Sequence, residues 1–196
     1  MYLKNEEFSV EIKLDSTYTI NSADNPFHYD KILYARETFQ NDYYKTLSIE
    51  VDNDIDIFKI ALIGDYFSYD FDCAVLNDDI LTVLQNQNLT SISLTDFTIL
   101  KSVKLPENGT NYGIYRCKHG YLIYGEIQIT MLDREFNVQW DFIGRDIFVT
   151  QNSNKPFAFN DKKIMLYDWE NNYYELDYNG NLIRNCQKIT WTFILV

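Results

Sequence analysis

GYLIYGEIQITMLDREFNVQWDFIGRDIFV, the stretch from Gly120 to Val149, decides the fold of this chain. Apolar and polar side chains alternate over residues 127–131, a polar loop follows Leu132 over residues 133–137, and the alternation resumes at Val138. Alternating runs rich in Ile, Val, Tyr and Trp, broken by a short loop with Asp and Asn, are typical of an antiparallel hairpin. The stretch therefore predicts a strand, a turn and a second strand, with one half-buried face.

The hairpin carries a motif that recurs along the chain. The motif is an apolar residue, Asp, two residues, a bulky residue or Gly, one residue and an apolar residue, and it begins at Leu132 and at Leu176. A version one residue shorter begins at Leu94, and looser matches begin at Leu14 and Val51. The five copies are spaced by 37 to 44 residues, which is the spacing of repeats that stack as small sheets.

The composition and the layout around the motif favour strands throughout. The chain has 16 Tyr and 13 Phe but only three Met, a balance that suits pleated sheets. In the last three copies a strand, a polar turn and another strand precede the motif. We therefore expect one all-β domain over residues 1–196, with less regular strands over residues 1–69 and three hairpin repeats over residues 70–190. A last strand is expected at Ile189–Val196, and a helix over residues 79–87 or over residues 34–44 is a local alternative.

The motif at Leu132 and Leu176 resembles the inner hairpin of β-propeller repeats of the WD40, Kelch and quinoprotein kinds. The sequence lacks the Gly-His pair and terminal Trp-Asp of WD40 repeats, the double Gly of Kelch and the tryptophan docking motif of quinoprotein enzymes. The resemblance thus implies a β-propeller-like stack of antiparallel hairpin repeats, small or incomplete, and no functional residue. A two-sheet β-sandwich is the alternative fold.

Charge and cysteine content restrict the classes of partner. The formal net charge is −12, and the acidic residues are spread along the chain without Lys and Arg clusters, so we expect no nucleic-acid partner and a protein partner that is basic. Three cysteines without close spacing do not form a disulfide framework, and no secretory signal is recognised, so we expect a cytoplasmic protein. No apolar run reaches the ~20 residues that span a bilayer, so we expect no membrane partner.

Candidate catalytic and metal-binding residues are sparse. The chain has two histidines, His28 and His119, which leaves little room for a Ser-His-Asp triad or a histidine-rich metal site. Cys117 lies beside His119, but a nucleophile and its base usually come from separate segments. The acids of residues 52–56 alternate as in a calcium loop, but Ile57 and Ile63 stand where an EF-hand needs Gly and Glu. We therefore expect no catalytic site, no metal and no cofactor.

Charged and aromatic residues that follow the hairpin turns are the candidate binding residues. Charges within strand-like apolar segments need partners, so one interpretation is structural, with Arg145 paired to Asp146, Glu126 or Asp168. The other interpretation is a recognition surface, because Trp, Tyr and Arg dominate the energetics of protein interfaces. The predicted binding residues are Trp140, Arg145, Asp168, Trp169, Glu170, Tyr173 and Tyr174.

The general character of the chain supports three hypotheses of function. A small, acidic β-protein rich in Asn and Tyr is similar to the immunity proteins of bacterial toxin systems, a resemblance that implies a non-enzymatic protein-binding module that neutralises a basic partner. A hydrolase or sugar-active enzyme with paired carboxylates on a propeller-like scaffold is the second hypothesis. A structural subunit of a larger assembly is the third.

Overall fold

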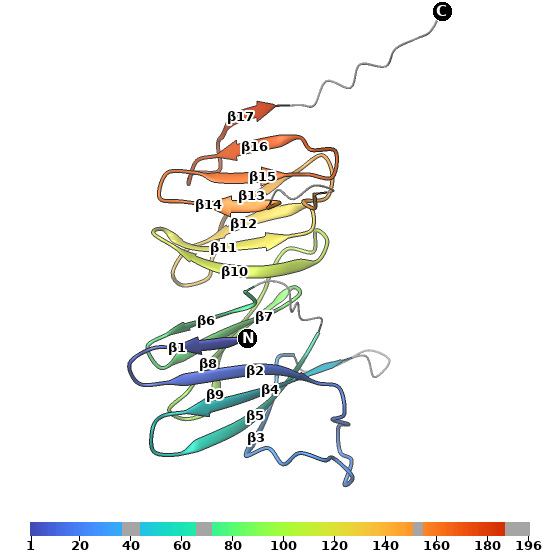
Figure 1. The fold of residues 1–196 in the computed structure, drawn as a ribbon, viewed down its shortest axis with the longest axis vertical. Helices are drawn as coiled ribbons and strands as arrows, with labels where there is room; N and C mark the ends of the chain where they lie inside the picture. The colour runs from blue at the N-terminus through green and yellow to red at the C-terminus, as the bar shows by residue number, and fades with distance from the viewer. Residues whose placement is uncertain (37–43, 66–71, 151–154, 187–196) are drawn as a thin grey trace, which may run out of the picture. The chain divides into compact units, whose positions relative to one another are not determined.

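The computed structural model describes residues 1–36, 44–65, 72–150 and 155–186. Within these residues the regular elements are all β-strands, and no helix could cross a membrane (Figure 1). The prediction of an all-β fold is confirmed, and the helix considered for residues 79–87 is wrong because a strand and a turn occupy this segment. The strand expected at Ile189–Val196 lies outside the described residues, as do residues 37–43 of the helix considered for residues 34–44.

The chain divides into two compact units. Unit 1 holds Met1–Glu107 and Asn111–Tyr115, and unit 2 holds Asn108–Thr110 and Arg116–Val196. The strand β10 (Asn111–Cys117) begins in unit 1 and ends in unit 2.

Unit 1 begins with a five-stranded sheet, sheet A, in the order β1-β2-β4-β5-β3. Its neighbouring strands are antiparallel except for β3 and β5, which run parallel. Buried residues such as Leu47, Ile49 and Val51 alternate with polar ones along β4, so one face of the sheet is turned to the core. The strands are β1 (Tyr2–Lys4), β2 (Ser9–Asp15), β3 (Lys31–Tyr34), β4 (Lys45–Asp52) and β5 (Ile57–Gly64).

The second sheet of unit 1, sheet B, is an antiparallel meander of four consecutive strands. Apolar side chains of sheets A and B form one hydrophobic core, in which Ile49 and Leu62 of sheet A belong to the same cluster as Leu81 and Ile92 of sheet B. The strands are β6 (Ala74–Asn77), β7 (Ile80–Gln85), β8 (Asn88–Ser93) and β9 (Thr98–Lys104).

Two further four-stranded sheets follow, sheet C in the order β10-β11-β12-β13 and sheet D in the order β14-β15-β16-β17. Aromatic rings join them, since Tyr124 stacks on Phe157 at 5.0 Å and Phe142 meets Tyr174 edge-on at 5.5 Å. The remaining strands are β11 (Gly120–Gly125), β12 (Gln128–Leu132), β13 (Val138–Ile143), β14 (Phe157–Phe159), β15 (Ile164–Tyr167), β16 (Tyr173–Leu176) and β17 (Leu182–Cys186).

Sheets B, C and D repeat one topology, in which four consecutive strands run up and down. The predicted antiparallel hairpin repeats are therefore confirmed, and the hairpin of the opening stretch is formed by β12 and β13. Successive four-stranded sheets are the building blocks of β-propellers, so the architecture fits the propeller-like resemblance.

The prediction that the opening hairpin has one half-buried face is wrong for its first strand. Every residue of β12 is buried, whereas β13 at the edge of the sheet is largely exposed. The polar side chains that produce the alternation are bonded internally: Gln128 Nε2 donates to Thr130 Oγ1 at 2.5 Å, and Thr130 Oγ1 donates to Asp141 Oδ1 at 2.6 Å. Alternation in this strand thus reflects a buried polar network instead of contact with water.

Three five-residue turns in unit 2 share one hydrogen-bond pattern. In each turn the Asp at the first position accepts the backbone N–H of the Asn at the fifth through Oδ1, and the Asn side chain donates to Oδ2. The fourth residue has a positive φ, which Gly180 adopts without strain. The Asp carboxylate, which belongs to the repeated motif at Asp133 and Asp177, therefore fixes the shape of the turn. The three turns are Asp133–Asn137, Asp168–Asn172 and Asp177–Asn181.

Candidate functional site

Asp168, one of the predicted binding residues, is completely buried in unit 2. Its Oδ1 accepts the Asn172 backbone N–H at 2.8 Å, and its Oδ2 accepts the Asn172 side-chain amide at 2.9 Å and the Tyr174 hydroxyl at 2.7 Å. Burial, reinforced by the hydrogen bond to Asp168, raises the pKa of Tyr174 to about 12. The Asp168 carboxylate is thus hydrogen-bonded to its own turn and to the strand that follows it.

Arg145, Trp169 and Glu170 lie around this buried group. The Arg145 backbone N–H donates to the Tyr174 hydroxyl at 3.3 Å, and the Trp169 backbone N–H donates to the Ile147 carbonyl at 2.8 Å. The side chains of Arg145, Trp169 and Glu170 are exposed. The structure therefore brings five of the seven predicted residues together, with three at the surface and Asp168 and Tyr174 beneath them.

Trp140 lies elsewhere, at the contact between sheets C and D. Its Nε1 donates to the Tyr178 carbonyl at 3.0 Å, and its ring lies against Gly180, where a Cβ atom would come within 2.8 Å of Trp140 Cδ2. The turn Asp177–Asn181 closes one end of sheet D, whereas the turn Asp168–Asn172 closes the other. Trp140, a residue of β13 in sheet C, thus contacts the end of sheet D that lies opposite to Asp168.

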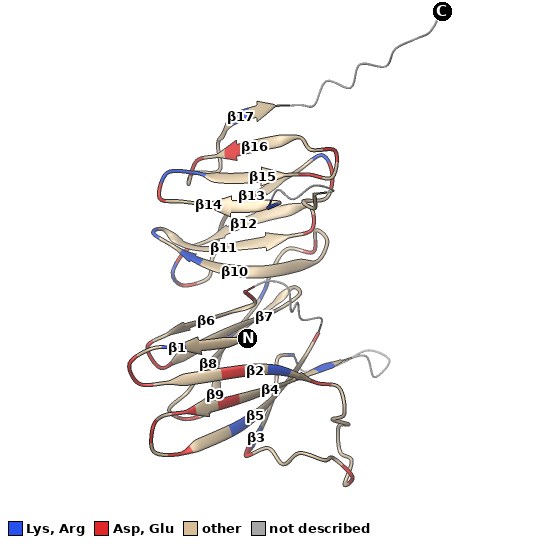
Figure 2. Ribbon diagram, in the orientation of Figure 1, with Lys and Arg blue, Asp and Glu red and all other residues tan. Residues whose placement is uncertain are grey.

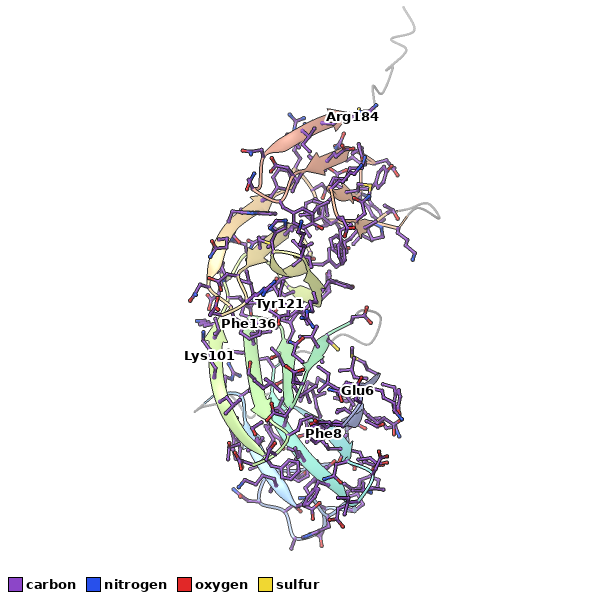
Figure 3. All side chains as sticks on the ribbon, turned by 90° about the vertical axis from the view of Figure 1, so that its left-hand side faces the viewer. Glu6, Phe8, Lys101, Tyr121, Phe136 and Arg184 are labelled. Atoms are coloured by element: carbon purple, nitrogen blue, oxygen red, sulfur yellow. The ribbon has the colours of Figure 1, made fainter. Side chains whose placement is uncertain are left out.

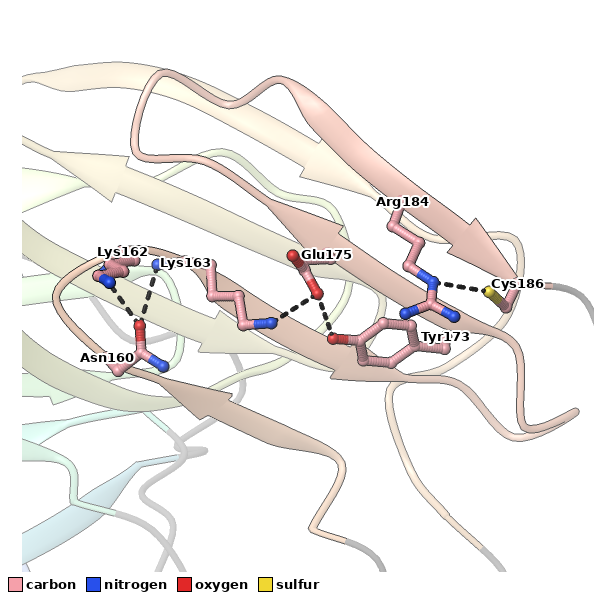
Figure 4. Close-up of polar contacts among 7 residues, drawn as sticks. All are labelled: Asn160, Lys162, Lys163, Tyr173, Glu175, Arg184 and Cys186. Carbon is pink, nitrogen blue, oxygen red and sulfur yellow. Dashed lines mark hydrogen bonds and ion pairs between the residues drawn. The ribbon is translucent and has the colours of Figure 1, made fainter.

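Tyr173 lies on the opposite face of β16 from Tyr174, because successive side chains of a strand alternate. Its hydroxyl donates to Glu175 Oε2 at 2.7 Å, and Lys163 Nζ forms an ion pair with the same oxygen at 2.8 Å (Figure 4). On β17, the strand next to β16, Arg184 Nε donates to Cys186 Sγ at 3.2 Å, a contact also drawn in Figure 4. Tyr173 is thus part of a small charged network on the outer face of sheet D.

A larger concentration of charge lies in unit 1. In sheet A, Ser9 pairs with Asp52, so the turn before β2 and the turn after β4 lie at the same end of the sheet. In sheet B, Ile80 pairs with Ser93, so the turn before β7 and the turn after β8 also lie at one end of the sheet. The amide of Asn5 donates to the Asp78 carbonyl at 2.7 Å and so brings these two ends together.

These turns carry eight carboxylates and no Lys or Arg over residues 5–8, 52–56, 78–79 and 94–97. Figure 2 shows acidic residues gathered on the turns at this end of unit 1, and Figure 3 looks onto it, with Glu6 labelled. We call this surface the acidic end. Its carboxylates are those of Glu6, Glu7, Asp52, Asp54, Asp56, Asp78, Asp79 and Asp96.

The longest turn of the acidic end, residues 52–56, keeps its shape without help from most of its carboxylates. Asp52 Oδ1 accepts the Asp54 N–H at 2.8 Å, and Asn53 Oδ1 accepts the N–H groups of Ile55 and Asp56 at 3.1 and 2.8 Å. Among the described residues, the carboxylates of Asp54 and Asp56 form no hydrogen bond or ion pair, and both are exposed. They are therefore available to an outside partner.

An apolar side chain stands among these acids. Ile55, at the tip of the turn, is 85% exposed, and Ile57 just after the turn is 57% exposed. The Phe58 and Phe97 rings, 4.4 Å apart, support this end from beneath by joining sheet A to the turn after β8. The acidic end thus offers a protruding apolar group flanked by the exposed Asp54 and Asp56.

The corresponding turns of unit 2 are electrically balanced. Residues 118–119, 133–137, 160–163 and 177–181, which connect the same strand pairs of sheets C and D, carry four acidic and four basic side chains. The Asp133 and Asp177 carboxylates also accept hydrogen bonds from backbone N–H groups of their own turns. The asymmetry shows that acidity at these turns is a property of unit 1 and is not required by the repeated topology.

None of the binding residues predicted from the sequence belongs to the acidic end. Alternate turns of an up-and-down sheet lie at the same end, so acids at every second turn of sheet B could have been recognised as one group. The approach of sheet A to that group depends on a contact between Asn5 and Asp78, 73 residues apart. No local pattern in the sequence reports such a contact.

Comparison with known proteins supports the fold alone. No protein-family model and no curated protein match the chain. Similar solved structures include the computationally designed Ika8 protein, with a TM-score of 0.51 and 9% identity over 76% of this chain and 47% of that one. BamB from Moraxella catarrhalis aligns with a TM-score of 0.46 and 8% identity, over 80% of this chain and 50% of BamB. The chain thus spans about half the length of these structures.

Proposed function

We propose that this chain is a non-enzymatic protein-binding module whose acidic end binds a basic protein and neutralises it, in the manner of an immunity protein. The observation that carries the proposal is the convergence of eight carboxylates from four turns of two sheets, on one of which Ile55 is exposed. The turns are held by backbone and side-chain hydrogen bonds that leave Asp54 and Asp56 to face solvent.

The two components of the acidic end have different roles in binding. Carboxylates gathered on one side focus the electrostatic field, which raises the association rate of a basic partner. Charge alone gives little affinity at physiological salt, because exposed ion pairs contribute only about 0–1 kcal/mol each. Ile55 supplies the apolar contact that slows dissociation once its exposed surface is buried in the partner.

Affinity capture with matched variants tests the proposal. The tagged wild-type chain, a triple variant Asp54→Asn, Asp56→Asn and Ile55→Ala, and a control Asp161→Asn in unit 2 are used to capture proteins from the native host. We expect one basic protein, recovered in stoichiometric amount by the wild type and the control and lost with the triple variant. Equal recovery by all three chains, or recovery of no stoichiometric partner, contradicts the proposal.

A further inference from the structure

A cavity of about 350 Å³ lies on the outer face of sheet A, away from the core side. Its floor is formed by side chains of β2, β4 and β5, including Glu11, Lys13, Glu50 and Lys59. These residues alternate along their strands with buried core residues such as Val10 and Ile49, and they therefore point to the other face. The segment between β2 and β3 forms its wall.

The wall is fixed by one buried carboxylate. Asp15 accepts the Tyr29 hydroxyl at 2.6 Å through Oδ2, and the N–H groups of Thr17 and Tyr18 at 2.9 and 3.1 Å through Oδ1. Burial acts to raise the pKa of Asp15, but these hydrogen bonds outweigh it and lower the pKa below its ordinary value. Tyr18 also packs edge-on against Tyr29, at 5.6 Å. The cavity is therefore largely formed before any ligand arrives.

Charges on the floor of the cavity are mutually compensated. Lys13 pairs with Glu11 at 2.6 Å, and Lys59 pairs with Glu50 at 3.4 Å. Glu11 and Glu50 face each other across β2 and β4, so ammonium donors and carboxylate acceptors lie close together on neighbouring strands. A strongly charged ligand would meet a group of its own sign, whereas hydroxyl groups can accept from the lysines and donate to the carboxylates.

Phe27 adds an apolar surface at the wall of the cavity, where it is 57% exposed. An exposed aromatic ring beside paired donors and acceptors matches a ligand that has both an apolar ring face and several hydroxyl groups. We propose that this cavity binds a neutral saccharide, with Phe27 against the sugar ring and the Lys13–Glu11 and Lys59–Glu50 pairs bonded to its hydroxyls. The site is separate from the acidic end and does not depend on a basic partner.

Titration with defined sugars tests the proposal. Backbone amide NMR spectra of the full chain are recorded with maltose, cellobiose and N,N′-diacetylchitobiose. We expect at least one of them to give saturable shifts at residues 11–17, 27–29 and 48–50, with a Kd in the ~0.1–10 mM range that is insensitive to salt. If none of the three gives saturable shifts there, or if binding weakens with salt as it would for a charged ligand, the proposal is overturned.

Variants distinguish this site from the acidic end. Phe27→Ala and Glu50→Gln both change exposed side chains and are expected to weaken sugar binding roughly tenfold each. Leu100→Ala, an exposed apolar residue of sheet B, and the pair Asp54→Asn and Asp56→Asn at the acidic end are expected to leave it unchanged. Equal affinity in Phe27→Ala and the wild type would overturn the assignment, and spectra of the free variants confirm that each is folded.

Discussion

Asp168 shows how a single carboxylate can hold a turn from inside the protein. It receives three hydrogen bonds from Asn172 and Tyr174 and has no exposed surface. Asp168→Ala leaves a buried tyrosine hydroxyl and a buried amide without their acceptor, so we expect a loss of about 2–4 kcal/mol in the free energy of unfolding, measured by urea denaturation. Glu170→Ala, at the exposed tip of the same turn, is the control and should change stability by less than ~0.5 kcal/mol.

Gln85 presents the opposite situation, a buried amide that is not bonded. Its side chain is completely buried, and neither Nε2 nor Oε1 has a hydrogen-bond partner within the described residues. Gln85→Met keeps a similar volume without the polar atoms, so we expect the free energy of unfolding to rise by about 1–2 kcal/mol. An unchanged or lower urea midpoint for this variant would show that the amide contributes to stability.

At the scale of the element, the contact between Trp140 and the turn Asp177–Asn181 joins two sheets of unit 2. Gly180 has a φ of 82° and leaves no room for a Cβ beside the indole ring. Gly180→Ala should therefore cost about 1–3 kcal/mol, seen as a lower urea midpoint and a shift in tryptophan fluorescence. Asn179→Ala, exposed in the same turn, serves as the control, and an equal effect of both variants would disprove the role of this contact.

The hairpin elements were predictable, whereas their surroundings were not. Alternation over residues 127–131 and the Asp at residue 133 predict β12 and its turn, because strand period and turn chemistry are local. Burial of β12 on both faces could not be read from the sequence, because Gln128 and Thr130 look solvent-facing until Asp141 is placed beside them. The buried state of Asp168 was also concealed, because an Asp that begins a polar turn looks solvent-facing until the segment at Arg145 and Ile147 is placed beside that turn.

Tyrosine ionisation governs stability of the whole molecule at high pH. Burial, assisted by hydrogen bonds to carboxylates, raises the pKa values of Tyr29, Tyr173 and Tyr174 from 10.0 to about 12. Their stabilising contribution is complete below pH 10, where both states are protonated, and is lost as pH rises toward 12, because the unfolded state releases its protons first. The urea midpoint should therefore fall between about pH 9 and about pH 11.5, and fall less steeply in Tyr29→Phe and Tyr174→Phe.

The sign of the charge of the molecule was predictable, but its location was not. The net charge of −12 led to the expectation of a basic partner but gave no position for its binding surface. The seven predicted residues were chosen for residue type, and the structure brings only five of them together, around Asp168. Trp140 contacts the turn at the other end of sheet D, and Tyr173 lies on the opposite face of β16. The acidic end forms only when two sheets of unit 1 bring four turns together.

The association rate of the basic partner with the acidic end is the most direct test of this account. Rates are compared for the wild type, for Asp54→Asn with Asp56→Asn, and for Asp161→Asn in unit 2, at about 20 mM and about 300 mM salt. We expect the acidic-end variant to associate several-fold more slowly than the wild type and the unit 2 control at low salt, with all three rates converging at high salt. Equal rates at low salt would contradict the assignment of the acidic end as the binding surface.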